Sequence, residues 1–225
     1  MMLLKCLGSG SKGNGWVIDA GDEAIVIDCG VPVSEMKIAV GFNVIKIKGC
    51  IVSHAHKDHA KYISQYKGTG FNVVLPYEHD GDFQTYQLGG FTVKTFPLVH
   101  DVRCFGFLIE HNGCRIMYAT DTEYIRYRFK NLNIVIVEAN YATDLLNDEL
   151  EDTVKRNHVL RGHMELATTQ RFLQVNCGID TKCVVLAHLS NDNADRERFR
   201  QSTQALVNCP VYIAEKGMVV DGEES

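Results

Sequence analysis

Ser53-His54-Ala55-His56-Lys57-Asp58-His59 places three imidazoles and one carboxylate within six consecutive positions. The segment directly follows the apolar run Gly49-Cys50-Ile51-Val52, a pattern that predicts a strand ending in a loop of nitrogen and oxygen ligands. Imidazole and carboxylate together suit zinc, manganese or iron. Desolvating three neighbouring imidazoles is costly unless a partner uses their lone pairs. We therefore interpret the loop as metal-binding, with two imidazoles directed at one ion and the Asp-His pair at a neighbouring one.

Composition limits the class of protein. The 225 residues are 45% hydrophobic and 23% charged, as in an ordinary globular protein, and we expect one domain over residues 1–225. The longest apolar runs, such as residues 134–137, are too short to cross a bilayer, and residues 1–10 lack the apolar region of a signal peptide. We expect no membrane contact. The net charge of −5 does not favour nucleic-acid binding over the whole surface, so a phosphate polymer would need a local patch or the metals.

Cysteine usage indicates the compartment. The eight cysteines are scattered, without a Cys-x-x-Cys motif, and several lie in or beside apolar runs. They are typical of reduced core residues in a cytoplasmic protein and not of a disulfide framework.

The periodicity of apolar residues predicts a layered α/β fold. Short strands are expected over residues 3–7, 15–19, 23–28, 49–53, 72–75, 91–96, 104–110, 115–119, 133–138, 183–188, 211–214 and 218–220, with hairpin turns at 21–22 and 112–113. Helices are expected over residues 144–157, 165–176 and 195–207. This order favours two sheets back to back with helices outside.

Three later residues are further candidates for metal ligands. His100, Asp121 and His188 each follow an apolar strand, at 91–96, 115–119 and 183–187. Side chains at the carboxyl ends of separate strands can converge on one site. Taken singly, each could be an ordinary surface or core residue; taken with the first cluster, the ordered set is specific.

This ordered set resembles the metallo-β-lactamase fold superfamily over essentially the whole chain. The segments 7–14, 26–30 and 188–193 are similar to those of the WalJ/YycJ-like branch, which is related to tRNase Z and associated with exonuclease activity on double-stranded DNA. The resemblance implies a four-layer αββα sandwich and two divalent ions, zinc or manganese. It implies that His54, His56 and His100 hold the first ion, that Asp58, His59 and His188 hold the second, and that Asp121 bridges them.

The resemblance extends to residues that would carry the chemistry. Glu138-Ala139-Asn140 matches a Glu-Ala motif of tRNase Z-like proteins, and Gly162-His163-Met164 matches a Gly-His segment that opens a helix. The chain departs from the branch at Met164-Glu165, where Leu-Ser is usual, and at Tyr141, where a His-Asp pair would start. Asp58, His163 and Glu138 are the predicted catalytic residues. His163 would be the general acid with Glu138 orienting its ring, and Asp28 would orient ligands or backbone from behind.

Substrate contacts are predicted in two segments. Ser11, Lys12 and Asn14 lie in the glycine-rich loop 8–14, which could offer backbone N–H groups and a cation to phosphate, although glycine turns need no ligand. Arg126 and Arg128 lie in the segment 124–130, which interleaves cations with aromatics. That segment could grip a nucleic-acid backbone and stack bases, or it could be a solvated face over packed aromatics.

The favoured function is a phosphodiesterase that uses a hydroxide bridging two metal ions, most simply a nuclease of the 5′-to-3′ exonuclease type on DNA. The alternatives are a tRNase Z-like RNA-processing nuclease and a thioester hydrolase of the glyoxalase II type. Asp121 argues against a β-lactamase, which carries Cys at that position, and His56 argues against the diiron flavoproteins, which carry Glu. A non-catalytic binding module is disfavoured because every expected ligand is retained. We expect a nucleic-acid partner and no organic cofactor; the oligomeric state stays open.

Overall fold

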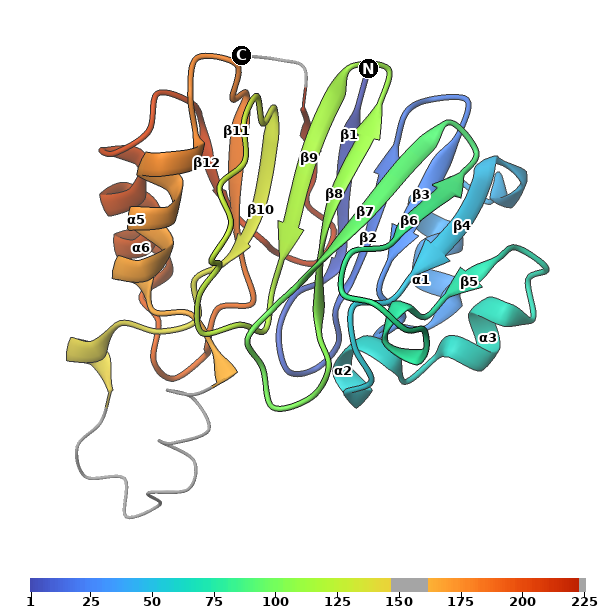
Figure 1. The fold of residues 1–225 in the computed structure, drawn as a ribbon, viewed down its shortest axis with the longest axis horizontal. Helices are drawn as coiled ribbons and strands as arrows, with labels where there is room; N and C mark the ends of the chain where they lie inside the picture. Colours follow the sequence, from blue (N-terminus) through green and yellow to red (C-terminus); the bar gives the residue numbers. More distant parts are fainter. Residues whose placement is uncertain (147–161, 223–225) are drawn as a thin grey trace.

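The structure is a computed structural model that describes residues 1–146 and 162–222. Within these residues two β-sheets pack face to face and helices cover both outer faces (Figure 1). The first sheet has the order β13 (Val219–Asp221), β1 (Leu3–Gly8), β2 (Gly15–Asp19), β3 (Ala24–Ile27), β4 (Ile47–Ile51) and β5 (Val73–Val74). The second has the order β12 (Val211–Ile213), β11 (Cys183–Ala187), β10 (Ile134–Glu138), β9 (Cys114–Ala119), β8 (Phe105–His111), β7 (Phe91–Pro97) and β6 (Thr85–Leu88).

Helices cover the outer faces of both sheets. The first sheet is covered by α1 (Val33–Ala39), α2 (Lys57–Ala60) and α3 (Ile63–Lys67), and the second by α5 (Leu166–Asn176) and α6 (Arg196–Gln204) (Figure 1). Three short 3₁₀ turns complete the described elements: η1 (Val44–Lys46), η2 (Pro76–Glu78) and η3 (Thr143–Leu145). The predicted α/β fold, with two sheets inside and helices outside, is confirmed.

The direction of the side chains alternates along each strand, and this alternation produces three hydrophobic cores. In β10, Ile134 and Ile136 belong to the core between the sheets, whereas Val135 and Val137 pack on the other face beneath α5 and α6. Successive strand residues point to opposite faces, so a strand buried on both sides must be apolar throughout. That is why residues 134–137 form a continuous apolar run. A third core lies between the first sheet and α1 to α3.

The predicted elements match the observed ones to within a few residues. The turn at Asn112-Gly113 joins β8 to β9 with φ values of 46° and 82°, the positive pair that a two-residue hairpin requires. The sequence analysis missed α1, α2, α3 and β6, whose four to seven residues are too short to show a clear period. The helix expected over residues 144–157 falls mostly outside the described residues; of its described residues, 144 and 145 belong to η3 and 146 follows it.

Strand direction brings the candidate ligands to one edge. β9, β10 and β11 are parallel, and β7 runs the same way because two antiparallel pairings separate it from β9. The carboxyl ends of these strands and of β4 therefore meet at the lower edge of the molecule in Figure 1. Open sheets generally bind ligands beyond the carboxyl ends of their parallel strands.

Asp19, at the end of β2, forms ion pairs with two lysines, and these contacts lead to a prediction about stability. Lys5 and Lys46 each place Nζ 2.7 Å from its carboxylate, and the Asp19 side chain is only 3% exposed. Burial alone would raise the pKa of Asp19, but the hydrogen bonds from Lys46 and Lys5 outweigh burial and lower it. Asp19→Asn should reduce the free energy of unfolding at pH 7 by about 2 kcal/mol, between the values for exposed and buried pairs.

The pH dependence follows from the lowered pKa. A depressed carboxyl pKa contributes stability above the unfolded-state pKa of about 3.9, and that contribution is lost as the pH falls toward the folded-state value. The free energies of unfolding of wild type and Asp19→Asn, measured with urea, should therefore differ by the full amount at pH 7. They should become equal as the pH is lowered below 4. Asp22→Asn, in the neighbouring exposed turn, is the matched control and should change little. A gap between wild type and Asp19→Asn that persists at low pH would contradict the ion-pair account.

Candidate metal centre

Three imidazoles converge from two strand ends. His54 and His56 follow β4 and His100 follows β7, and their ligand atoms lie within 4.8 Å of one another. His100 Nε2 is 3.2 Å from His56 Nδ1. Burial lowers the pKa of both His54 and His100, so these imidazoles are neutral and keep a lone pair for a cation. The structure thus brings the predicted first ligand group together.

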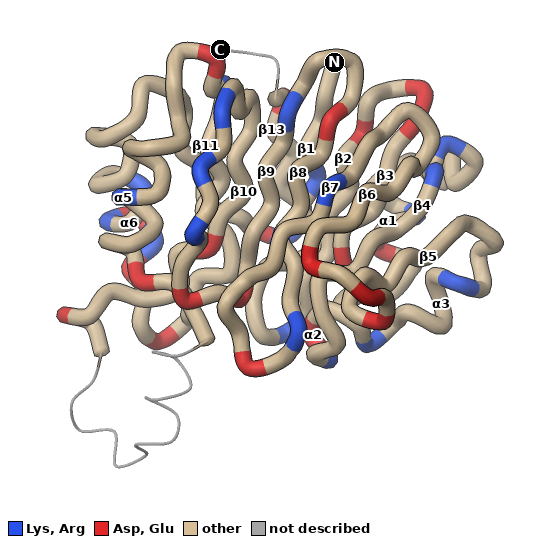
Figure 2. The backbone as a smooth tube through the Cα atoms, viewed as in Figure 1, with Lys and Arg blue, Asp and Glu red and all other residues tan. Residues whose placement is uncertain are grey.

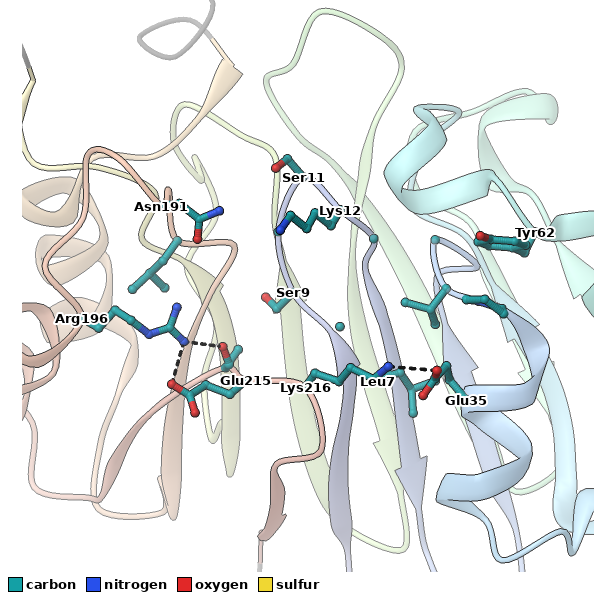
Figure 3. A pocket seen from close by; sticks show the side chains of 18 residues that line it. Leu7, Ser9, Ser11, Lys12, Glu35, Tyr62, Asn191, Arg196, Glu215 and Lys216 are labelled. Atoms are coloured by element: carbon teal, nitrogen blue, oxygen red, sulfur yellow. Dashed lines mark hydrogen bonds and ion pairs between the residues drawn. The ribbon is translucent and has the colours of Figure 1, made fainter.

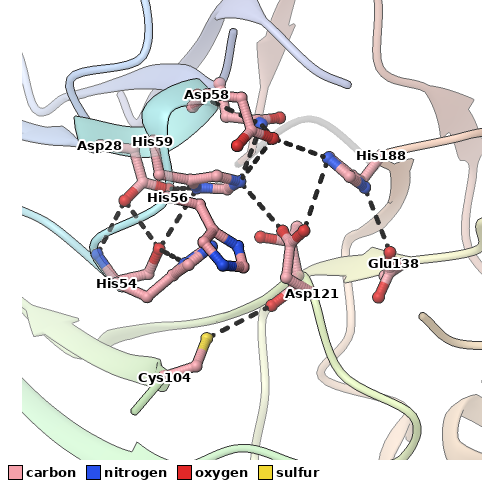
Figure 4. Close-up of polar contacts among 12 residues, drawn as sticks. Asp28, His54, His56, Asp58, His59, Cys104, Asp121, Glu138 and His188 are labelled. Carbon is pink, nitrogen blue, oxygen red and sulfur yellow. Dashed lines mark hydrogen bonds and ion pairs between the residues drawn. The ribbon is translucent and has the colours of Figure 1, made fainter. Parts of the chain in front are cut away.

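A second group lies beside the first (Figure 4). Asp58 and His59 come from α2, Asp121 follows β9 and His188 follows β11; their ligand atoms also lie within 4.8 Å of one another. Asp121 is central: its Oδ2 is 3.0 Å from His59 Nε2 and its Oδ1 is 3.6 Å from His188 Nε2. The predicted bridging residue therefore contacts ligands of the second group, and its charge also acts on His54 and His100 of the first.

The electrostatics of the second group favour a positive charge. Burial would lower the pKa of His59, but the carboxylates of Asp121 and Asp28 raise it to about 10. Burial opposes ionisation of His188 as well, yet Asp121, Asp58 and Glu138 raise its pKa well above the usual value. The imidazoles in turn hold the pKa of Asp121 well below its usual range despite its burial. These carboxylates stabilise a cation, whether a proton on imidazole or a divalent ion.

Unpaired buried atoms test whether a metal fits. Five buried side-chain nitrogen or oxygen atoms of the described residues lack a hydrogen-bond partner, and three of them are His54 Nε2, Asp121 Oδ2 and His188 Nε2. Leaving such atoms unsatisfied costs about 1–3 kcal/mol each. All three belong to the predicted ligand set. The donor set of imidazole and carboxylate fits a divalent ion such as zinc.

Asp28 holds the ligands from behind, in the place predicted for it. One carboxylate oxygen accepts hydrogen bonds from Ser53 N and Oγ at 2.8 and 2.9 Å. The other lies 2.8 Å from His59 Nδ1 and accepts from the Tyr118 hydroxyl at 2.7 Å. A carboxylate behind a ligating imidazole sets its tautomer and ring orientation. Tyr118 in β9 reaches Asp28 across the interface between the sheets, a contact that the sequence analysis missed.

Tyr118→Phe tests this support. The substitution removes one of the hydrogen bonds to Asp28 while keeping the buried ring, so the fold should be retained. We expect the affinity for zinc to fall by about 10-fold, the lower end of the effect of such supporting residues. Competition with a chromophoric chelator measures the affinity. Tyr86→Phe, a partly buried tyrosine outside the site, is the control; equal affinities for all three proteins would contradict the assigned support.

Glu138 and His163 form a second polar unit beside the ligands. Glu138, the last residue of β10, is fully buried, and its Oε1 lies 2.7 Å from His163 Nδ1 and 3.2 Å from His188 Nδ1. Its Oε2 accepts from the backbone N–H groups of Thr122 and Met164. Burial would lower the pKa of His163, but the Glu138 carboxylate outweighs it and raises that pKa. The predicted contact between Glu138 and His163 is present.

The glycine-rich loop packs against the candidate ligand residues. Asn14 is 1% exposed, and its Nδ2 lies 3.2 Å from Asp58 Oδ2 and 2.8 Å from His59 Nε2. The Asn14 amide is thus buried against the candidate ligand residues, and contact of Asn14 with substrate stays a prediction. Gly30 packs equally closely: a Cβ there would lie 1.7 Å from Asp58 O.

Ser11 and Lys12 are exposed and line a cavity of about 550 Å³ next to the loop (Figure 3). Across this cavity Lys216 pairs with Glu35 at 2.9 Å, and Arg196 pairs with Glu215 at 3.0 Å. Much of the charge in the cavity is thus neutralised internally. Contact of Ser11 and Lys12 with substrate stays a prediction.

Three positions of the site have left-handed backbone. Asp28, Asp121 and His188 have φ values of 64°, 59° and 52°. Each follows the end of a strand, where the chain turns sharply. Asp, Asn and His are enriched among the non-glycine residues that adopt this conformation.

Sequence reasoning missed several supporting residues. Ser9 Oγ accepts from His188 N at 2.8 Å, and Asn140 Nδ2 donates to His188 O at 2.7 Å. Asp101 lies 3.1 Å from His100 Nε2 and 3.4 Å from His56 Nε2. Its position directly after His100 was the available signal. No helix within the described residues has the length and apolarity to cross a membrane.

Comparison with known proteins gives the following similarities. The family model described as the metallo-beta-lactamase superfamily matches residues 8–163. The exodeoxyribonuclease YycJ of Bacillus anthracis is 24% identical over 237 residues, covering 89% of this chain and 87% of that protein.

Two solved structures share the fold. YhfI from Bacillus subtilis, a metallo-beta-lactamase fold protein, superposes with a TM-score of 0.75 at 19% identity and covers 97% of this chain and 98% of its own. The short form of human tRNase Z superposes with a TM-score of 0.64 at 17% identity and covers 98% of this chain and 99% of its own. At these identities the structures show a common architecture.

Proposed function

The chain belongs to the metallo-beta-lactamase superfamily and is a metal-dependent hydrolase, and we propose that it is a phosphodiesterase with two divalent ions that acts as an exonuclease on DNA. Two neighbouring ligand groups support two ions: three imidazoles in one, and Asp58, His59, Asp121 and His188 in the other. We assign His54, His56 and His100 to one ion, Asp58, His59 and His188 to the other, and Asp121 to both.

The contact between Glu138 and His163 carries the proposal. A phosphodiester of deoxyribose expels an alkoxide, which leaves readily only when it is protonated. His163 Nδ1 lies 2.7 Å from a fully buried carboxylate and 3.8 Å from Asp121 Oδ1, and the Glu138 carboxylate raises the pKa of His163, so the contact favours a protonated imidazole beside the ligand groups. A thioester expels a thiolate, which needs little acid assistance. The acid therefore favours phosphodiesters over thioesters.

The residues of this chain would divide the work as follows. Two divalent ions, when bound, supply a nucleophile at neutral pH and neutralise charge on the phosphate. Asp58 and Asp121 hold the ligand cluster at the strand ends, and Asp28 fixes the ring of His59. His163 would donate a proton to the departing oxygen, with Glu138 orienting its ring and keeping it charged.

DNA is proposed as the substrate because the similar protein of Bacillus anthracis is named an exodeoxyribonuclease. We propose digestion from the 5′ end. The eight cysteines are all free, which supports a reducing, cytoplasmic location.

A substrate panel tests the proposal. Protein loaded with zinc or with manganese is offered single- and double-stranded DNA and RNA with either end blocked, a tRNA precursor, bis(p-nitrophenyl) phosphate and a glutathione thioester. We expect DNA to be shortened progressively from an open 5′ end, with loss of activity after chelation. Metal analysis should give two ions per chain. Cleavage of the thioester alone, or of RNA in preference to DNA, would overturn the proposal.

A further inference from the structure

Three arginines with no carboxylate partner among the described residues line one groove. Of the eight arginines in the described residues, five lie within ion-pair distance of a described Asp or Glu: Arg103, Arg115, Arg196, Arg198 and Arg200. The other three are Arg126, Arg128 and Arg171, for which no carboxylate within the described residues lies that close. All three line a single groove of about 240 Å³. In a chain with net charge −5, three grouped cations that no described carboxylate pairs with require an explanation.

The first wall of the groove is the segment 123–130, which leads from Asp121 toward β10. Burial alternates along it: Arg126, Arg128 and Lys130 are exposed, whereas Tyr127 and Phe129 point inward. The Phe96 ring contacts both inward aromatics, with centroids 5.8 and 4.9 Å away. The inward rings pack the segment against the core, and the alternating exposure places the cationic side chains along the exposed side of the segment.

The second wall is one face of α5. Thr168, Arg171, Phe172 and Val175 recur at helical spacing, so they share the side of α5 that faces the segment. Arg171 therefore joins Arg126 and Arg128 from an element 43 residues further along the chain. Figure 2 shows separate cationic positions along a stretch that runs between β10 and α5.

The groove lies within reach of the metal centre. Arg126 is five residues and Arg128 seven residues from Asp121, so their Cα atoms are at most about 18 and 25 Å from that of Asp121. At about 3.4 Å per nucleotide along a duplex strand, 25 Å corresponds to about seven nucleotides. A strand of that length can occupy the metal centre and the groove together.

We propose that this groove binds the phosphodiester backbone of the nucleic-acid strand several nucleotides from the bond that is cleaved. The inference rests on the proposed function and adds a second contact region to it. Arginine suits the role because its planar fork donates two parallel hydrogen bonds to a phosphate. Tyr124, 42% exposed and covered by Arg126 at 5.7 Å from its ring centroid, adds a face for base stacking. The larger cavity beside Lys12 is a weaker candidate because four of its charged residues pair with one another.

The test compares two charge-matched double variants, Arg126→Gln/Arg128→Gln in the groove and Arg198→Gln/Arg200→Gln on α6. Binding of a fluorescent 15-nucleotide single-stranded DNA is followed by anisotropy from 0.05 to 0.3 M salt, in EDTA so that no turnover occurs. Each lost phosphate contact should reduce the slope of log affinity against log salt by about 0.7. The groove variant should lose about 1.4 in slope and about 25-fold in affinity at 0.1 M salt.

Additional variants and substrates complete the test. Arg171→Gln alone should weaken binding about 5-fold by the same relation, and the α6 variant should match wild type. With metal-loaded protein, the groove variants should lose more turnover of DNA than of bis(p-nitrophenyl) phosphate, because the latter is too small to reach the groove, and the α6 variant should match wild type on both. Equal weakening by both double variants would mean that only net charge matters and would overturn the proposal. So would polyglutamate competing as strongly as DNA of the same charge, since that result assigns the groove to an acidic protein.

The outcomes separate this inference from the proposed function. If the protein cleaves phosphodiesters but the groove variant binds DNA as tightly as wild type does, the proposed function is retained and the groove is not a DNA-binding site. Failure to cleave any phosphodiester would remove the function, while the anisotropy measurement would still decide whether the groove binds DNA.

Discussion

Asp121→Asn should lower kcat/KM for phosphodiester substrates by about 10³-fold or more, the size of effect expected when one preorganised electrostatic group is lost. Asp121 Oδ2 lies 3.0 Å from His59 Nε2, and Oδ1 lies 3.6 Å from His188 Nε2. The amide keeps the shape of the side chain but removes the negative charge that both ligand groups share. We therefore expect the number of bound ions to fall from two to one or none.

The choice of asparagine separates ligand loss from damage to the backbone. Asp121 has a φ of 59°, a conformation that Asn tolerates well. Kinetics with bis(p-nitrophenyl) phosphate and metal analysis on the same preparation measure the two effects together. Asp22→Asn, an exposed carboxylate in a turn, should behave as wild type. Full activity with two bound ions in Asp121→Asn would show that Asp121 does not bridge.

His163→Gln should lower kcat for DNA by about 10²–10⁴-fold, the usual contribution of a general acid. The loss should depend on the leaving group. Bis(p-nitrophenyl) phosphate expels nitrophenolate, which needs no proton, so its turnover should change by less than about 10-fold. His79→Gln, in a loop outside the site, is the control.

The pH profile distinguishes a proton donor from a purely structural histidine. A general acid must be protonated, so activity on DNA should fall as the pH rises through the pKa of His163. The Glu138 carboxylate raises that pKa against the opposing effect of burial. In Glu138→Gln the alkaline limb should therefore move to lower pH. Equal losses on both substrates in His163→Gln, with an unmoved limb in Glu138→Gln, would assign His163 to positioning.

Much of the candidate site could be predicted because its candidate ligands follow recognisable local sequence patterns. His54, Asp121 and His188 each stand within two residues of the end of a short apolar run, and a strand end is recognisable from sequence. The direction of the strands then brings such positions together at one edge. The paired sheets and outer helices followed from the same apolar patterns.

The remaining features depend on contacts between distant segments. Tyr118 lies inside a buried strand and has the pattern of any core aromatic; only the packing of the two sheets brings its hydroxyl to Asp28. Asn14 sits in a glycine-rich loop that resembles an exposed turn, yet α2 covers it, and its N–H donates to Asp58 O. The partners of the arginines are likewise set by tertiary structure, as Arg198 and Asp144 show.

The left-handed backbone at Asp28, Asp121 and His188 restricts how this centre can change during evolution. A residue type introduced there must supply the chemistry and also tolerate a conformation that costs most L-residues about 1–2 kcal/mol. Substitution of one of these residues by alanine, valine or threonine would remove its polar group and also strain the backbone. Such a substitution would therefore reduce stability as well as function. A sulfur ligand at position 121 would meet the same conformational cost, because cysteine is not among the residue types enriched in this backbone conformation.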